Sequence, residues 1–179
     1  MCVIDKLFEK EIWEAFFIHK IEQGNISEKD TADLRRFIDG KEYLPVAGRI
    51  RINQSFSAPQ KTLISKSKAG RKRTVYTFGR EENYVLKLIS FLLRDYDYLF
   101  SPNLYSFRKE SGVKKAAEDV MKIKDLDDRY VYKADISDYF NSVDVDILLP
   151  NLKKALSDDS ELYLFFETLL RNPYVQYNG

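Results

Sequence analysis

The sequence predicts an α+β fold in which helices lead into a basic hairpin, a long helix, a single strand and a final pair of helices. Two observations favour this fold. Apolar residues recur at helical spacing near both ends of the chain, whereas the segment 43–78 has short alternating runs broken by proline and glycine. This order of elements argues against a parallel nucleotide-binding sheet, and the chain has neither a Walker lysine motif nor a Gly-x-Gly-x-x-Gly fingerprint.

The composition is that of an ordinary folded chain. Of its 179 residues, 44% are hydrophobic and 32% are charged, which is enough apolar material for one or two small cores. Cys2 is the only cysteine and His19 the only histidine, so the sequence allows neither an internal disulfide nor a zinc site of Cys and His ligands. We therefore expect a cytoplasmic protein. Charges interrupt the first apolar residues, which argues against a signal peptide and against a membrane span.

The first 42 residues are predicted to form two structural helices. One extends from about Cys2 to Glu22, where apolar residues lie near helical spacing, and Gly24 ends it. The other begins after Ser27, because Ser27 followed three residues later by Asp30 resembles a capping box.

Extended chain and hairpins are predicted from Tyr43 to Phe78, with the turn of a hairpin at 68–71. This segment is also strongly basic. From Arg49 to Arg80 the chain carries nine lysines and arginines and no aspartate or glutamate.

The next segment is predicted to be mainly helical. A long helix runs from Glu81 to about Asp97, with apolar residues at helical spacing. A loop from Phe100 to Arg108 follows, and a polar helix extends from about Val113 to Ile123.

A buried strand is predicted at Arg129–Ile136, because Val131 and the tyrosines beside it favour strands and acidic turns bound the run. Two more helices are predicted at about 145–156 and 160–170.

Charge is separated along the chain. The basic segment is followed, from Asp125 to Asp146, by seven aspartates against two cations, Arg129 and Lys133. A surface that handles phosphate beside a divalent-metal site needs this pairing of charges. Two solvated loops of opposite sign would give the same pattern, and the charges alone leave both interpretations open.

The segment with the most chemical information is Lys133–Asp144. A carboxylate at the end of an apolar strand needs a partner or a metal, and the Asp-x-x-Asp step from Asp135 to Asp138 suits Mg²⁺. Phe140 then lies where it can form a wall beside a bound nucleotide. The alternative is that Asp135 or Asp138 caps the following helix and that Phe140 packs in the core.

Three segments resemble reverse transcriptases. Residues 133–144 resemble the first catalytic motif of their palm, and Lys66–Phe78 resembles the fingers hairpin that closes over the incoming nucleotide. Asn103–Arg108 is similar to the Ser-x-Gly-Phe-Arg element of group II intron and retron-like enzymes, although its glycine is absent here. The three segments occur in the family's order, and the similarity covers about 43–170.

The resemblance implies N-terminal helices at 1–42, polymerase fingers at 43–128 and the first part of a palm at 129–179. The palm is expected to be incomplete, because the chain has no Tyr-x-Asp-Asp motif. Asp158-Asp159 is the only later aspartate pair, and its polar context predicts a helix cap instead.

The resemblance also assigns roles to individual residues. Asp135 is implied to be the catalytic residue and to bind two Mg²⁺ ions with the carbonyl of Ile136. Lys66, Arg73, Asp138, Tyr139 and the steric gate Phe140 are implied to contact the nucleotide, and Arg71, Lys72 and Arg108 the template. Arg108 as a purely structural contact is an equally open interpretation.

The implied activity is RNA-directed DNA synthesis, in which this chain is inactive alone. Its expected partners are an RNA template, a DNA primer, deoxynucleoside triphosphates and the rest of the palm and thumb. Exposed apolar faces would also allow self-association. Two other classes fit less completely: a non-catalytic nucleic-acid-binding or scaffold module, and a palm-type nucleotide cyclase, whose Asp-x-Asp-x-Phe pattern is broken here by Ser137 and Tyr139.

Overall fold

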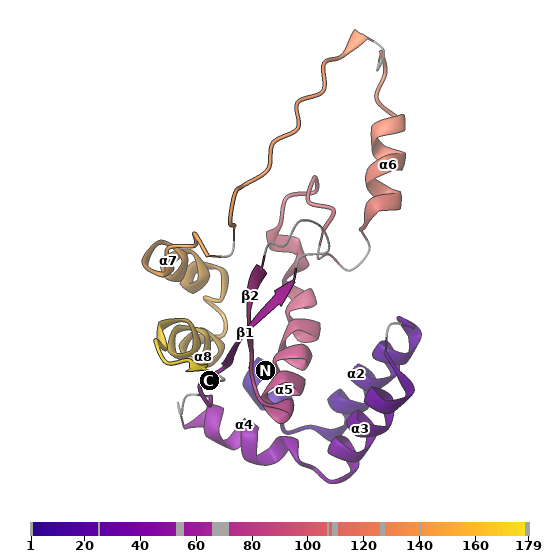
Figure 1. The fold of residues 1–179 in the computed structure, drawn as a ribbon. Coiled ribbons are helices and arrows are strands. Elements are labelled where there is room, and N and C mark those ends of the chain that lie inside the picture. The colour runs from indigo at the N-terminus through magenta and orange to yellow at the C-terminus, as the bar shows by residue number, and fades with distance from the viewer. Residues whose placement is uncertain are drawn as a thin grey trace.

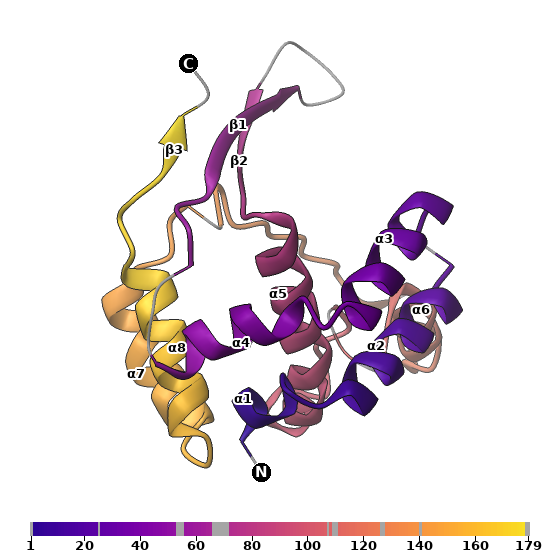
Figure 2. The ribbon, with the colours of Figure 1, turned by 90° about the horizontal axis from the view of Figure 1, so that it is seen from below.

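The computed structural model describes residues 2–24, 26–52, 56–65, 72–106, 108, 111–125, 128–139 and 141–177. Within these ranges the chain forms eight α-helices, one 3-10 helix and a three-stranded mixed sheet, so the predicted α+β class is confirmed. The helices form the larger part of the molecule (Figure 1), and the sheet projects from them (Figure 2).

The N-terminal residues form three helices, where the sequence predicted two: α1 (Val3–Lys6), α2 (Lys10–Glu22) and α3 (Glu28–Asp39). The predicted helix at 2–22 is interrupted after α1. At this break the indole N–H of Trp13 donates to the carbonyl oxygen of Leu7 at 2.9 Å, so a side chain satisfies that carbonyl.

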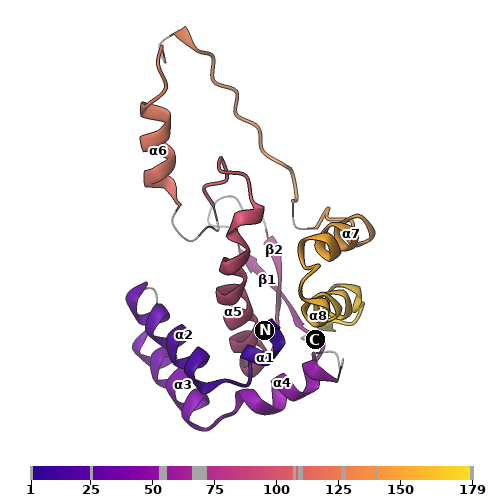
Figure 3. The same cartoon turned by 180° about the vertical axis from the view of Figure 1, so that it is seen from behind.

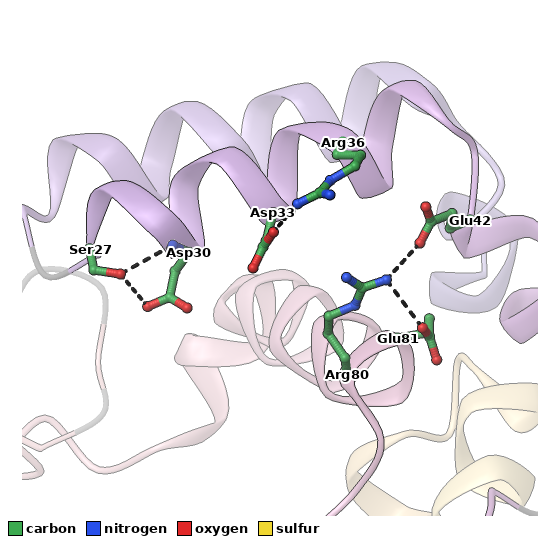
Figure 4. Close-up of polar contacts among 7 residues, drawn as sticks. All are labelled: Ser27, Asp30, Asp33, Arg36, Glu42, Arg80 and Glu81. Atoms are coloured by element: carbon green, nitrogen blue, oxygen red, sulfur yellow. Dashed lines mark hydrogen bonds and ion pairs between the residues drawn. The ribbon is translucent and has the colours of Figure 1, made fainter.

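The predicted start of α3 is confirmed. The Oγ of Ser27 accepts from the N–H of Asp30 at 3.1 Å and its hydroxyl donates to the Asp30 carboxylate at 2.7 Å, which satisfies a backbone N–H that the first turn leaves without a partner (Figure 4).

The prediction of extended chain from Tyr43 onward was wrong at its start, because Tyr43–Arg51 forms helix α4. Pro45 is the third residue of this helix, in the turn whose N–H groups have no intrahelical acceptor, so it costs no hydrogen bond there. The helix is stabilised by burial of one face, made by Tyr43, Val46, Ala47 and Ile50 at helical spacing.

The predicted hairpin is confirmed. Strands β1 (Gln60–Ser65) and β2 (Lys72–Thr77) pair antiparallel, with Gln60 opposite Thr77, while the predicted turn at 68–71 lies outside the described residues. A short third strand, β3 (Gln176–Tyr177), pairs parallel with the start of β1 and gives the strand order β2-β1-β3 (Figure 2).

The later helices agree with the sequence prediction. Helix α5 (Arg80–Leu92) continues into the 3-10 helix η1 (Leu93–Leu99). The others are α6 (Val113–Met121), α7 (Val145–Ala155) and α8 (Ser160–Arg171).

The predicted buried strand at 129–136 was wrong. These residues are extended but form no strand, and Val131 and Tyr132 are 90% and 91% exposed. Helix α6 and this segment stand apart from the other helices in Figures 1 and 3. Strand propensity reflects packing against neighbouring strands, and the described part of the chain places no strand beside these residues.

One hydrophobic core joins α1 to α5 with α8. Trp13 lies within it, fully buried, and its ring stacks on Tyr43 with centroids 5.1 Å apart. Phe16 and Phe37 contact the same indole edge-on, at 6.1 and 5.4 Å. Aromatic packing therefore connects α2, α3 and α4.

Two buried carboxylates fix the helices around this core. Glu82, only 3% exposed, accepts from Nη2 of Arg49 at 3.0 Å and from the N–H of Ser57 at 2.8 Å, which connects α5 to α4 and to the chain before β1.

Asp159 is the second buried carboxylate, at 4% exposure. Its Oδ1 accepts from the N–H of Leu162 at 3.0 Å, which confirms the predicted helix cap on α8. Its Oδ2 accepts from the N–H of Val3 at 2.6 Å, so the same carboxylate also satisfies the first N–H of α1, whose N-cap is Cys2. The Cys2 thiol donates to Oδ1 at 2.8 Å, and burial together with this bond raises the pKa of Cys2 to about 11.

Among the described helices, none combines the length and the apolar character needed to cross a lipid bilayer.

Candidate functional site

Asp135 lies in the extended segment between α6 and α7, and its side chain is exposed. Ile136, whose carbonyl was predicted as a metal ligand, follows it at 65% exposure. Within the described ranges, no three His, Cys, Asp or Glu side chains lie close enough together to hold a metal ion. Asp135 and the Ile136 carbonyl are oxygen ligands of the type that Mg²⁺ prefers, but they form an incomplete set for a two-metal site.

Asp138 belongs to a tight turn. Its backbone φ is +52°, its carboxylate accepts from Nδ2 of Asn141 at 2.6 Å, and its carbonyl accepts from the N–H groups of Asn141 and Ser142 at 3.0 and 3.1 Å. Tyr139 is half exposed, and the predicted steric gate Phe140 lies outside the described residues. The turn reverses the chain between the extended segment and α7.

Neither Asp135 nor Asp138 caps the helix that follows. The cap of α7 is Asp144, whose carboxylate accepts from the N–H of Asp146 at 2.8 Å and of Ile147 at 3.3 Å. The capping role considered for the two earlier aspartates is therefore filled by a third one, and Asp135 is left in an exposed position.

The basic residues predicted to contact the nucleotide and template lie on or next to the hairpin. Lys72 and Arg73 begin β2, both exposed, and Arg73 pairs across the hairpin with Ile64. Lys66 and Arg71 lie outside the described residues. The hairpin therefore presents cations to solvent at the end of the strands nearest its turn.

Arg108, predicted as a template contact or a structural residue, binds the backbone and side chain around η1. Its Nε and Nη2 donate to the Asp97 carboxylate at 3.0 to 3.1 Å, and its Nη1 donates to the carbonyl of Ser101 at 2.8 Å. The hydrogen bonds to Asp97 raise the pKa of Arg108. Arg108 therefore makes the kind of contact that its structural interpretation predicted.

A second group of basic residues was not identified from the sequence. It lies between α2 and α5, in a cavity of about 290 Å³ whose lining includes Lys20, Lys87, Arg94 and Arg108. The signal that could have found it is the spacing of Arg80, Lys87 and Arg94, each seven residues after the one before, which places them on one face of a helix.

Arg80, at the start of this row, is neutralised by acidic neighbours. Its Nη2 donates to Glu42 at 3.1 Å and to Glu81 at 3.4 Å, and Figure 4 shows both carboxylates meeting the guanidinium at the N-terminus of α5. On α3, Asp33 is paired in the same way with Arg36. Further along, Lys87 of α5 and Arg94 of η1 differ from Arg80, because neither forms an ion pair among the described residues.

The pKa of His19 responds to the positive charges beside it. Arg94 Nη1 lies 2.9 Å from Nε2 of His19, and the pKa of His19 is lowered, first by burial and then by the positive charges of Arg94 and Lys20. Because the folded-state pKa lies below that of the unfolded chain, protonation of His19 favours unfolding as the pH falls below about 6.5.

We expect Arg94→Gln to raise the pKa of His19, because it removes the charge with the larger of the two repelling effects. An NMR titration of the single histidine measures this, with Arg36→Gln as the control, since Arg36 pairs with Asp33 on α3. An unchanged pKa in Arg94→Gln would contradict the contact.

A scan against protein-family models gave no match, and searches of curated proteins and of solved structures found no significantly similar chain.

Proposed function

We propose that this chain forms the fingers and the first palm segment of an RNA-directed DNA polymerase, with Asp135 as its first metal-binding aspartate. The observation that supports the proposal most is the antiparallel hairpin of β1 and β2, with Lys72 and Arg73 exposed, in the segment that resembles the fingers hairpin of reverse transcriptases. Fixed cations at such a position stabilise the negative charge that a triphosphate gains during nucleotide transfer.

The candidate catalytic and nucleotide-binding residues would contact the metal ion or the incoming nucleotide. Asp135 and the Ile136 carbonyl would hold Mg²⁺, which when bound acts as a Lewis acid on the phosphate oxygens. Lys66 and Arg73 would bind the triphosphate, while Asp138 and Tyr139 would border the nucleotide. Phe140 would exclude a ribose 2′-hydroxyl.

Template contacts would come from Arg71, Lys72 and Arg108, and the substrates would be an RNA template, a DNA primer and deoxynucleoside triphosphates.

The remaining carboxylate ligands would come from the rest of the palm, in this chain's continuation or in another chain. The exposed apolar side chains of the extended segment, including Tyr130, Val131 and Tyr132, would then be covered by the strands of that palm. Such strands would also supply the pairing that residues 129–136 lack among the described residues.

The test is DNA synthesis on a primed RNA template by the full product of the gene, with Mg²⁺ present. We expect Asp135→Ala to lower synthesis by roughly 100- to 1,000-fold, the loss that removal of a group stabilising transition-state charge produces. Asp128→Ala is the matched control, because Asp128 is also an exposed aspartate between α6 and α7, and we expect this variant to retain activity. Equal activity in the two variants would refute the role of Asp135.

A nucleic-acid-binding module is the second candidate function. The observation in its favour is that exposed cations lie on the hairpin, whereas the described residues gather no ligand set around Asp135. This function predicts that the full gene product binds RNA or DNA but does not synthesise DNA.

A further inference from the structure

We propose that the groove between α2 and α5 binds the phosphate backbone of a single-stranded nucleic acid, through Lys20, Lys87 and Arg94. This inference does not rest on the polymerase proposal, because the groove is formed by helices outside the hairpin and outside the Asp135 segment.

The basic part of the groove is the cavity of about 290 Å³, because no carboxylate lies among its described lining residues, whereas the lining of the adjoining cavity of about 450 Å³ includes Asp30 together with Arg80. Within the described part of the chain, the contacts of its three cations go to neutral groups. Lys20 donates to Oε1 of Gln23 at 3.4 Å, Lys87 lies 5.7 Å from the Tyr84 ring centroid, and Arg94 lies against His19. These cations therefore keep charge available for an anion.

Arg108, the fourth cation among the described residues that line the cavity of about 290 Å³, has an acidic partner, unlike the other three. It is neutralised by Asp97. We therefore leave Arg108 out of the predicted phosphate contacts.

The shape of the groove favours a linear ligand. The cavity of about 290 Å³ shares Phe16, Lys20 and Lys87 with a neighbouring cavity of about 450 Å³, so the two form one continuous groove along α5. Seven residues of α-helix advance about 10.5 Å, which separates Lys87 from Arg80 along α5. Arg94 follows Lys87 by seven residues and lies in η1, which continues α5. Cations spaced in a row suit repeated charges, whereas a small anion would need cations that converge on one point.

Neutral donors and aromatic rings in the groove suit nucleic acid better than an acidic peptide. Ser90 and Gln23 line the basic cavity and offer hydroxyl and amide groups that bond phosphate and sugar oxygens. Phe16 and Phe91 line the same cavity and provide apolar rings against which bases or sugars can pack.

The experiment measures binding of fluorescent single-stranded 12-mers of RNA and of DNA to the chain, by anisotropy over a range of salt concentrations. The test variant carries Lys20→Gln, Lys87→Gln and Arg94→Gln. The control carries Lys29→Gln, Lys153→Gln and Lys154→Gln, which remove the same charge from exposed positions elsewhere.

We expect the test variant to bind about 100-fold more weakly than the control at 0.1 M salt, since each single-strand phosphate contact contributes roughly fivefold there. The slope of log K against log salt should fall by about 2. Lys87→Gln alone changes an exposed side chain, so it keeps the test valid if the triple variant does not fold, and it should weaken binding about fivefold.

Photo-crosslinking of a 4-thiouridine 12-mer locates the ligand, and we expect adducts within α2 and α5. Affinity of the test variant within about threefold of the control, or adducts confined to the hairpin, would overturn the proposal. Competition by polyglutamate equal to that of RNA, charge for charge, would also overturn it, because the groove would then bind any polyanion. These outcomes are independent of whether the full gene product synthesises DNA.

Discussion

Replacing Trp13 with alanine is expected to lower the free energy of unfolding by about 4 kcal/mol, the middle of the range for large aromatic deletions. The indole is fully buried and contacts the rings of Phe16, Phe37 and Tyr43, so its removal leaves a cavity where α2, α3 and α4 meet. It also leaves the Leu7 carbonyl without the indole N–H that it accepts from.

Urea unfolding followed by far-ultraviolet circular dichroism measures this loss, since Trp13 is the only tryptophan and the variant has no indole fluorescence. Trp13→Phe is the matched comparison. It keeps an aromatic ring but loses the hydrogen bond to Leu7, so we expect a loss of about 1–2 kcal/mol. Equal losses in the two variants would show that the hydrogen bond, and not ring packing, dominates.

Asp159→Ala is expected to cost about 3 kcal/mol, because two buried backbone N–H groups, of Val3 and Leu162, lose their acceptor together. The neighbouring Asp158→Ala is a close control. Asp158 is exposed, and its two oxygens share long contacts of 3.3 and 3.4 Å with the Tyr96 hydroxyl, so we expect a change within about 0.5 kcal/mol.

A second measurement separates the local effect of Asp159 from its effect on global stability. The hydrogen bond to Asp159 contributes to the raised pKa of the Cys2 thiol, so Asp159→Ala should lower that pKa and speed the reaction of Cys2 with a disulfide reagent. Asp158→Ala should leave the reaction rate unchanged. A rate that is the same in both variants would contradict the Cys2–Asp159 contact.

Local signals in the sequence predicted much of this fold. Ser27 and Asp159 mark helix starts through their own side chains, and the apolar period of α5 needs no distant partner to be recognised. Helix α4 was missed because Pro45 and its neighbours resemble a turn. Whether Pro45 breaks a helix depends on its position, and the sequence does not show that the helix begins only two residues earlier.

Features that depend on distant parts of the chain were harder to predict. A strand at 129–136 requires a neighbouring strand, which its own tyrosines and valine do not specify. The basic groove combines Lys20 of α2 with residues of α5, and only the tertiary fold brings them together. For the candidate catalytic segment, the sequence pointed to Asp135 by its resemblance to a motif, but the described residues gather no set of metal ligands around it.

The two backbone bonds made by Asp159 have a consequence for how the protein is made. Val3 and Asp159 are separated by 156 residues, so on the ribosome the first N–H of α1 lacks this acceptor until most of the chain has been translated. At roughly 5–20 residues per second, this interval lasts about 8–31 s. During it, the apolar residues of α1 have no α8 to pack against, and they are open to chaperones that bind nascent chains.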